Sequence, residues 1–270
     1  MEENIDLLLT ISPIDGRYRN ITEKISDYFS EYAFIKYRVK IEIDWLKFFL
    51  KLIQKEEKNI DILNDIINSF DIKEAKKVKQ IEQKTNHDVK AIEYYIRKKL
   101  EENNLKEYCS FVHFACTSED INNLAYGKMI TDCVNNVLIK DMEKLIENVR
   151  IEAKKLASIP MLSHTHGQNA TPTTCGKEFA IFVYRWESIL NLIKNIKLKG
   201  KFSGAVGNFN AHSIAYPEID WINIAKGFVE SEGLEFNPLT TQIESHDIIS
   251  ILFSYIKAFN NITMDFNSDM

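Results

Sequence analysis

Residues 163–172 hold the side chains of this chain that are best suited to chemistry. They place His164, His166, two threonine hydroxyls and a glutamine amide between two helical patterns. Glycine and proline favour an irregular conformation for such a run, outside regular secondary structure. Because imidazole titrates near neutral pH, a histidine presented there predicts acid–base catalysis. A polar loop between two helices is the alternative.

Three further polar segments could bind a ligand. Arg17 beside Tyr18 offers a cationic fork next to a phenol, which suits a phosphate or a carboxylate. Residues 86–88 read Asn-His-Asp, and residues 117–120 read Thr-Ser-Glu-Asp. Viewed alone, Arg17 is better explained as a surface charge and the other two segments as candidate helix caps.

Phosphate-loop and nucleophilic chemistry have weaker support. The glycine-rich residues 200–208 match neither nucleotide-binding motif, and no strand pattern precedes them, which favours a close-packed turn. Ser118 and Asp120 could belong to a Ser-His-Asp arrangement. However, the sequence has no Gly-x-Ser-x-Gly elbow to present the serine.

A metal site is also weakly supported. His164 and His166 could form half of a zinc or iron site. Further ligands would have to come from distant residues such as His87 or His212, and nothing in the sequence brings these close. We therefore expect no metal.

Composition and charge limit the class of protein. The chain has 270 residues, enough for a sizeable core, and its 45% hydrophobic and 27% charged residues are typical of soluble globular proteins. The net charge of −5 provides no basic surface for nucleic acid or membrane, and no stretch is long enough to span a bilayer. Four dispersed cysteines indicate reduced thiols and a cytoplasmic protein.

Apolar residues recur at helical spacing in four long segments. Within residues 34–52, six of them step by 3, 4, 4, 3 and 4 positions, close to the helical period of 3.6. Similar stripes occupy residues 142–156, 179–193 and 248–266, and no comparable alternation predicts strands. The pattern predicts an all-α protein whose polar segments lie between helices. Because the last stripe ends without a glycine cap or a proline, we expect a chain that has been cut.

Six polar segments occur in one order along the chain: residues 12–18, 84–90, 114–123, 165–172, 204–208 and 240–244. In that order and approximate spacing they resemble the adenylosuccinate lyase family of the fumarase/aspartase superfamily. The resemblance covers the chain from about Ile11 to its end. Members of the family catalyse β-elimination: adenylosuccinate gives AMP and fumarate, and the succinyl-carboxamide ribotide of purine synthesis is cleaved in the same way.

The resemblance implies that His166 is the general acid, which protonates the departing nitrogen, and that Thr165 supports it. The residues implied to bind substrate are Arg17 and Tyr18 at the phosphate, Asn86, His87 and Asp88 along the substrate, Thr117 and Ser118 at the succinyl carboxylate, and Gln242. No metal or organic cofactor is implied.

The sequence departs from the family pattern at three points. His164 stands where the family usually has arginine, and Asn169 where it usually has proline. The family's catalytic base is a serine on a mobile loop reading Ser-Ser-x-Met-Pro-x-Lys-x-Asn-Pro. No such string occurs in this sequence, so we expect the chain alone to lack the base.

The resemblance also implies an architecture. We expect an N-terminal helical domain over residues 1–111 and the first part of a long-helix central bundle over residues 112–270, without the C-terminal domain. The family forms homotetramers whose active sites are shared between subunits. The alternatives are another lyase of the superfamily, acting on argininosuccinate or fumarate, and a catalytically incomplete fragment that serves as a binding or assembly module.

Overall fold

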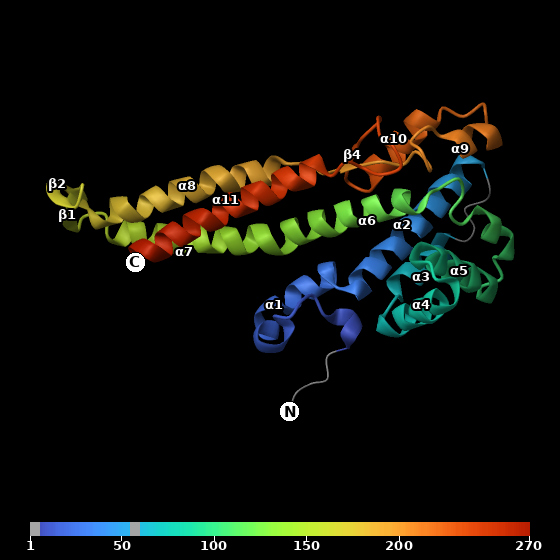
Figure 1. Ribbon diagram of the computed structural model, residues 1–270, viewed down its shortest axis with the longest axis horizontal. Coiled ribbons are helices and arrows are strands. Elements are labelled where there is room, and N and C mark those ends of the chain that lie inside the picture. Colours follow the sequence, from blue (N-terminus) through green and yellow to red (C-terminus); the bar gives the residue numbers. More distant parts are fainter. Residues whose placement is uncertain (1–5, 55–59) are drawn as a thin grey trace. The chain divides into compact units, whose positions relative to one another are not determined.

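The structure, a computed structural model, describes residues 6–54 and 60–270 of the chain. It divides into two compact units. Figure 1 shows the chain coloured from its N-terminus to its C-terminus. The first unit comprises Met1–Cys133 and Leu198–Ser245, and the second comprises Val134–Lys197 and His246–Met270. These limits differ from the domain boundary expected after residue 111, which stays a prediction.

Helices make up most of the first unit. In chain order they are α1 (Asp15–Phe29), α2 (Glu31–Leu52), α3 (Ile60–Asn68), α4 (Ile72–Thr85), α5 (Asp88–Glu102), α6 (Ser118–Cys133), α9 (Asn210–Ala215) and α10 (Trp221–Ser231). Short 3₁₀ helices cover Leu7–Leu9 and Lys106–Phe111. Strands β3 (Lys199–Gly200) and β4 (Glu235–Phe236) pair in parallel.

Helix α2 is the central helix of the first unit. It begins where the Ser30 hydroxyl accepts a hydrogen bond from the Ala33 N–H at 3.1 Å, which satisfies a free amide of the first turn. It contains the predicted apolar stripe of residues 34–52 and packs against α1, α3, α4, α5 and α6. The hydrophobic core therefore forms around this helix, from side chains of α2 to α5 and of the segment that follows them.

Trp45 of α2 joins the two sequence segments of the first unit. Its ring is fully buried and lies 4.3 Å from the Phe202 ring and 5.1 Å from the Phe228 ring, measured between centroids. Its indole N–H donates to the Phe114 carbonyl at 3.1 Å. The segment Leu198–Ser245 is thus anchored on α2 by aromatic packing, which positions the loops on either side of Phe202.

The second unit consists of long helices and one hairpin. Its elements are the π-helical turn Val134–Leu138, α7 (Ile139–Lys155), β1 (Pro160–Thr165), β2 (Gln168–Thr174), α8 (Cys175–Asn195) and α11 (Asp247–Asp269). Helix α8 packs against both α7 and α11. Trp186 of α8 is fully buried and donates to the Thr263 hydroxyl of α11 at 3.2 Å, which fixes the register of these two helices.

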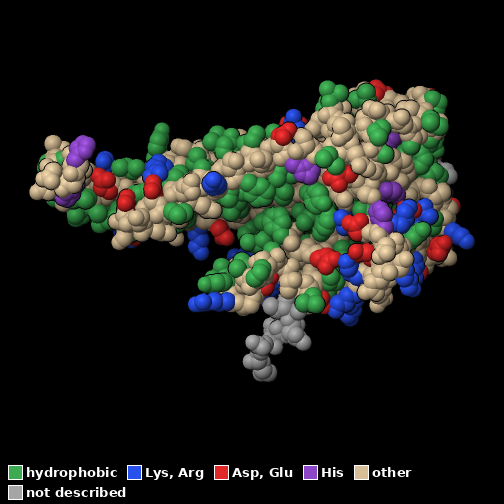
Figure 2. Space-filling view, in the orientation of Figure 1, with side chains coloured by type: hydrophobic (Ala, Val, Ile, Leu, Met, Phe, Trp, Pro, Cys, Tyr) green, Lys and Arg blue, Asp and Glu red, His purple; other side chains and the backbone are tan. Residues whose placement is uncertain are grey.

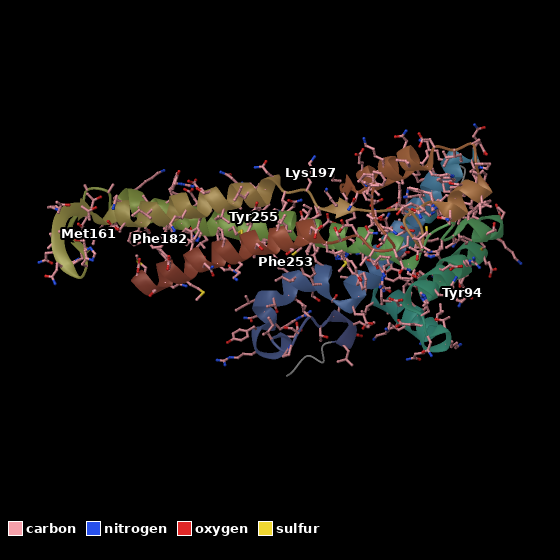
Figure 3. The ribbon with its side chains drawn as sticks, turned by 45° about the horizontal axis from the view of Figure 1, so that its top comes forward. Tyr94, Met161, Phe182, Lys197, Phe253 and Tyr255 are labelled. Atoms are coloured by element: carbon pink, nitrogen blue, oxygen red, sulfur yellow. The ribbon has the colours of Figure 1, made fainter. Side chains whose placement is uncertain are left out.

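Large apolar side chains remain exposed along the second unit (Figure 2). Tyr184 is 73% exposed, Met264 69% and Phe253 52%. Figure 3 labels Phe253 and Tyr255 on α11, and Met161 on the hairpin. An apolar surface of this kind is more typical of an interface than of a free surface.

The predicted helical stripes are confirmed, since all four coincide with long helices: α2, α7, α8 and α11. The expectation of an irregular run at residues 163–172 was wrong. This run belongs to the antiparallel pair of β1 and β2. No helix within the described ranges 6–54 and 60–270 is long and apolar enough to cross a membrane. The four cysteines are free.

Candidate functional site

His166 lies at the tip of the hairpin in the second unit. Thr165 pairs with Gln168, so His166 and Gly167 form a two-residue turn. Their φ angles are +52° and +72°. Positive φ at both positions is what a type I′ turn requires, and its twist matches that of the flanking strands. Glycine adopts this conformation freely and histidine does so more readily than most residues, so the His-Gly pair specifies the turn.

The hairpin presents its side chains to solvent. Thr165, His166 and Gln168 are all exposed, as is His164 on β1. The register shifts between Leu162 and His164, and the Ser163 hydroxyl donates to the Thr171 carbonyl across this irregularity. His166 therefore stands on a conformation fixed by backbone pairing, with its imidazole accessible to a ligand.

Residues 86–88 form the junction between α4 and α5 in the first unit. Asn86 adopts a left-handed conformation at the end of α4, with φ +51°. The His87 ring then caps α5, since its Nδ1 accepts from the Lys90 N–H at 3.1 Å. The predicted helix-cap role is therefore real. A cavity of about 520 Å³ also opens here, lined by Lys79, Glu82, Gln83, Asn86, His87 and Asp88.

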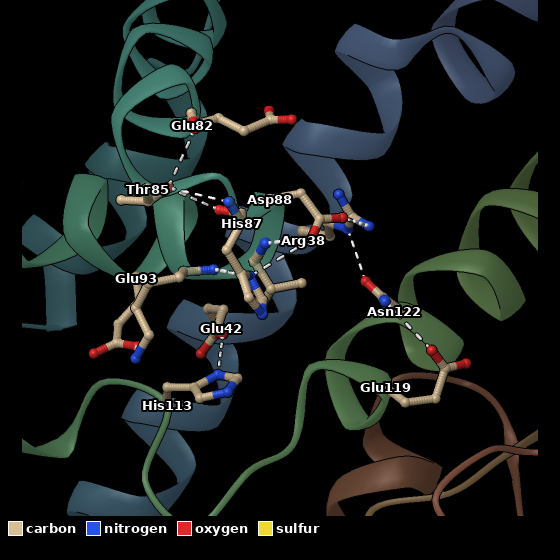
Figure 4. Close-up of polar contacts among 12 residues, drawn as sticks. Arg38, Glu42, Glu82, Thr85, His87, Asp88, Glu93, His113, Glu119 and Asn122 are labelled. Carbon is tan, nitrogen blue, oxygen red and sulfur yellow. Dashed lines mark hydrogen bonds and ion pairs between the residues drawn. The ribbon is translucent and has the colours of Figure 1, made fainter.

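Arg38 of α2 connects this junction to α6 (Figure 4). Its guanidinium donates to the Asp88 carboxylate at 2.7 Å and to the Asn122 side-chain oxygen at 2.8 Å, and it lies 3.5 Å from the centre of the Phe34 ring. Partial burial opposes ionisation of Asp88, but the Arg38 charge and the hydrogen bonds from Val89 and Arg38 together outweigh it and hold the pKa of that carboxyl below its usual value. Asp88 is thus kept charged and oriented.

Thr117 and Ser118 stand where α6 begins. Both side chains are half-buried, and the Thr117 N–H donates to the Asp120 carboxylate at 2.9 Å. This bond is half of a capping box, because Asp120 is the third residue of the helix. Asp120 also contacts residues outside α6: its carboxylate accepts hydrogen bonds from the Ser203 N–H at 3.0 Å and the Gly204 N–H at 3.0 Å.

Lys201 completes this buried group. Its ammonium lies 2.8 Å from Asp120, and both side chains are 0% exposed. It also donates to the carbonyls of Gly204 at 3.0 Å and Gln242 at 2.7 Å. The backbone of Gln242 is thereby fixed while its side chain remains exposed.

The glycine-rich residues 200–208 form a close-packed turn, as their sequence predicts. Gly207 has φ +79°, and a Cβ at this position would lie 2.1 Å from the Thr240 carbonyl oxygen. Only glycine allows the backbone to approach so closely. This contact brings residues 200–208 against the segment that carries Gln242.

Arg17 and Tyr18 lie in the first turn of α1. The buried Asp15 carboxylate fixes this turn by accepting from the N–H groups of Ile11 at 2.6 Å and Ser12 at 2.7 Å. Those backbone bonds hold the pKa of Asp15 below its usual value. Arg17 is exposed, with its guanidinium 5.4 Å from the centre of the Tyr18 ring. Both side chains remain accessible.

The structure brings together part of the predicted set. Within the first unit, Arg38 links residues 86–88 to α6, where Thr117 and Ser118 lie, and Lys201 links α6 to Gln242. Thr165 and His166 belong to the second unit. Sequence reasoning missed Arg38 and Lys201. In each case the available signal was a charge whose two neighbours in sequence are uncharged: Tyr37 and Val39 beside Arg38, and Gly200 and Phe202 beside Lys201.

Two other histidines lie close to the predicted polar segments, His113 partly buried and His212 fully buried. The Nδ1 atom of His113 lies 2.6 Å from Glu42, and the carboxylate outweighs the effect of burial and raises the pKa of His113 (Figure 4). Both ring nitrogens of His212 are buried and have no hydrogen-bond partner among the residues that the structure describes. Over the described part of the chain, no group of three or more His, Cys, Asp or Glu side chains could hold a metal ion.

Comparison with known proteins identifies relatives over nearly the whole chain. The chain is 45% identical to the adenylosuccinate lyase of Buchnera aphidicola from Acyrthosiphon pisum and 42% identical to that of Escherichia coli K12, with 97% of the chain and 59% of each relative covered. It is 41% identical to the adenylosuccinate lyase of Haemophilus influenzae, covering 98% of the chain and 60% of that relative. The chain thus spans about three fifths of the length of these relatives.

Solved structures share the fold at low identity. A fumarate lyase from Mesorhizobium sp. BNC1 superposes with a TM-score of 0.73 at 18% identity, covering 92% of this chain and 56% of that one. A β-carboxy-cis,cis-muconate cycloisomerase from Acinetobacter calcoaceticus sp. ADP1 gives 0.74 at 16% identity, covering 93% and 58%. The predicted lyase-like helical fold is confirmed.

The family model described as Lyase matches residues 16–270, which include every candidate residue of both units. Together with the identities above, this match shows that the chain belongs to the lyase family and is a homologue of the adenylosuccinate lyases.

Proposed function

We propose that the protein to which this chain belongs cleaves adenylosuccinate to AMP and fumarate, and cleaves the succinyl-carboxamide ribotide of purine synthesis in the same way. The observation that carries this proposal is the identity of 41–45% to adenylosuccinate lyases of three bacteria over 97–98% of the chain. The reaction is a β-elimination without an organic cofactor or metal.

His166 acts as the general acid of this reaction. A base removes a proton from the succinyl Cβ, the electron pair forms the double bond of fumarate, and the bond from carbon to nitrogen breaks. His166 donates its proton to that nitrogen, because an amine anion is a poor leaving group. Its exposed position on a turn of fixed conformation supports this role. The base is the serine of the family's signature loop, whose string does not occur in these 270 residues.

The substrate is held by residues of the first unit. Arg17 and Tyr18 bind the phosphate, Thr117 and Ser118 bind the succinyl carboxylate, and Thr165 supports His166. The remaining contacts come from Asn86, His87, Asp88 and Gln242. The cavity beside His87 and the anchoring of these segments by Arg38 and Lys201 support this assignment, because an anionic ligand needs donors whose positions are fixed before it binds.

The protein acts as a cytoplasmic homotetramer whose active sites combine residues of several subunits. The exposed apolar side chains of the second unit, such as Tyr184, Phe253 and Met264, support an assembly that covers them. Light scattering of the purified protein should give the mass of four subunits.

A substrate panel tests the reaction. Protein expressed from the complete gene should release fumarate from adenylosuccinate, and release it from argininosuccinate or malate at negligible rates. Preferred cleavage of argininosuccinate or malate would assign the protein to another lyase of the superfamily. Binding of AMP without any turnover would identify a binding or assembly module instead.

A further inference from the structure

The buried pair of Lys201 and Asp120 has every hydrogen-bonding group satisfied. The three ammonium protons of Lys201 face three acceptors: the Asp120 carboxylate and the carbonyls of Gly204 and Gln242. Asp120 in turn accepts from the backbone of Thr117 on one side and from residues 203 and 204 on the other. Such a group is rigid, and removal of one charge leaves the other buried and uncompensated.

The charge of Asp120 lies close to the residues proposed to bind the succinyl carboxylate. It is the third residue of α6, next to the hydroxyls of Thr117 and Ser118, which form no side-chain hydrogen bond in the part of the chain that the structure describes. A helix N-terminus attracts anions. An uncompensated carboxylate there would repel an incoming carboxylate, and repulsion is strong where water is excluded. Lys201 cancels that repulsion.

We propose that Lys201 is a positioning residue that sets the affinity of this site for the succinyl carboxylate of the substrate. It acts chiefly through its charge, which neutralises Asp120 beside Thr117 and Ser118, and to a smaller extent by holding the backbone of Gln242. This inference rests on the proposed function. Because Lys201 is 0% exposed and touches no substrate, its removal changes KM more than kcat.

Four variants test the proposal in the protein expressed from the complete gene. Lys201→Met leaves Asp120 uncompensated, and we expect KM for adenylosuccinate to rise about tenfold or more while kcat changes far less. Asp120→Asn leaves Lys201 as the uncompensated charge, and a buried cation attracts a carboxylate, so the KM of this variant should stay at or below the wild-type value. The double variant Asp120→Asn/Lys201→Met removes both charges and should recover most of the loss. Lys199→Met is the matched control, because Lys199 is partly exposed and its ion pair with Glu235 is long, at 3.7 Å.

The directions of these changes in KM distinguish a charge effect from a simple loss of structure. A KM for Lys201→Met within about twofold of wild type would overturn the proposal, as would a double variant no better than Lys201→Met. If Lys201→Met does not fold, Asp120→Asn still decides: a raised KM in that variant overturns the proposal, and a KM at or below the wild-type value supports it.

A binding measurement keeps this test separate from the proposed reaction. The dissociation constant of fumarate, measured by calorimetry for the same proteins, should follow the same order as KM. A wild-type protein that binds fumarate but does not cleave adenylosuccinate would reject the proposed function and leave the role of Lys201 to be judged from these constants. A wild-type protein that does not bind fumarate would overturn the carboxylate site itself.

Discussion

The two units present their candidate residues in opposite ways. In the first unit, segments distant in sequence are fixed by buried charges: Arg38 holds Asp88, and Lys201 holds Asp120. In the second unit, His166 is exposed at the tip of a hairpin, on a turn whose conformation depends on two adjacent residues. One arrangement relies on tertiary contacts and the other on local backbone geometry.

This difference matches the proposed division between substrate binding and proton transfer. Groups that bind an anion gain from donors whose positions are set before the ligand arrives, which requires a network beneath them. A proton donor must reach the substrate, and a short turn on two paired strands presents it without burying it. We therefore expect variants of the first unit to change stability together with KM, and variants at His166 to change mainly the rate.

Replacement of His166 by glutamine should have the largest effect, and it tests whether proton transfer depends on the second unit. We expect kcat for adenylosuccinate cleavage to fall about 10²–10⁴-fold, the usual contribution of a positioned acid. The free energy of unfolding should change by only about 1 kcal/mol or less, because the side chain is exposed and the substitution affects only the preference for positive φ. His164→Gln is the matched control, two residues earlier and also exposed. Equal losses of kcat in both variants would contradict the assignment of the acid to His166.

We expect His212 to make the stability of the first unit sensitive to acid. Its ring is 0% exposed and contacts the rings of Phe202, Phe209 and Trp221, and burial lowers its pKa to about 4. The unfolded chain, with an ordinary histidine pKa of about 6.5, binds the proton first, so stability falls as the pH falls from 6.5 towards 4. We expect this residue to cost about 3 kcal/mol at pH 4.

Urea unfolding between pH 7 and pH 4 measures this cost. His212→Phe keeps an aromatic ring but cannot take up a proton, so its stability should fall less over that range than that of the wild type. An identical fall in both proteins would show that other groups cause the acid sensitivity.

Variants of Arg38 and Arg185 compare a half-buried ion pair with an exposed one. Arg38→Met removes a donor from Asp88 and from Asn122, and we expect a loss of about 1–3 kcal/mol in the free energy of unfolding together with a higher KM. Arg185→Met in the second unit removes an exposed pair with Asp265 and should cost about 0–1 kcal/mol. A larger loss for Arg185→Met would contradict the comparison.

Two helix caps, one in each unit, offer a further comparison of modest effects on stability. The Ser30 hydroxyl is buried, accepts from the Ala33 N–H and donates to the Ser26 carbonyl, so Ser30→Ala should cost about 1–2 kcal/mol. Thr174 caps α8 in the second unit through a longer bond of 3.3 Å to the Lys177 N–H, and Thr174→Ala should cost about 0.5–1 kcal/mol. Thermal unfolding of both variants would test this order.

Most of the helical fold could be predicted from the sequence, because long apolar stripes at a spacing of 3.6 residues have one stable solution. The hairpin was missed for a specific reason. Gly167 and Pro172 were interpreted as interruptions of regular structure, whereas His166-Gly167 forms the two-residue turn of a strand pair. The threonines on β2 favour a strand, but the alternation is too short to outweigh the breakers.

The motifs of the candidate site could be predicted, but the residues that connect them could not. Arg38 lies 50 residues before Asp88, and Lys201 lies 81 residues after Asp120. No local pattern pairs residues at such separations. A charge flanked by an aromatic and an apolar residue, as at Arg38 between Tyr37 and Val39, indicates only that a partner exists.

The satisfied pair of Lys201 and Asp120 also constrains how this lineage can diverge. Loss of either charge alone costs several kcal/mol, most of the margin that keeps a protein folded, whereas simultaneous loss of both costs far less. A single substitution at either position therefore gives a protein that is too unstable to be retained. We expect the two codons to be exchanged together or not at all, so that descendants either keep the pair or replace it by two neutral residues.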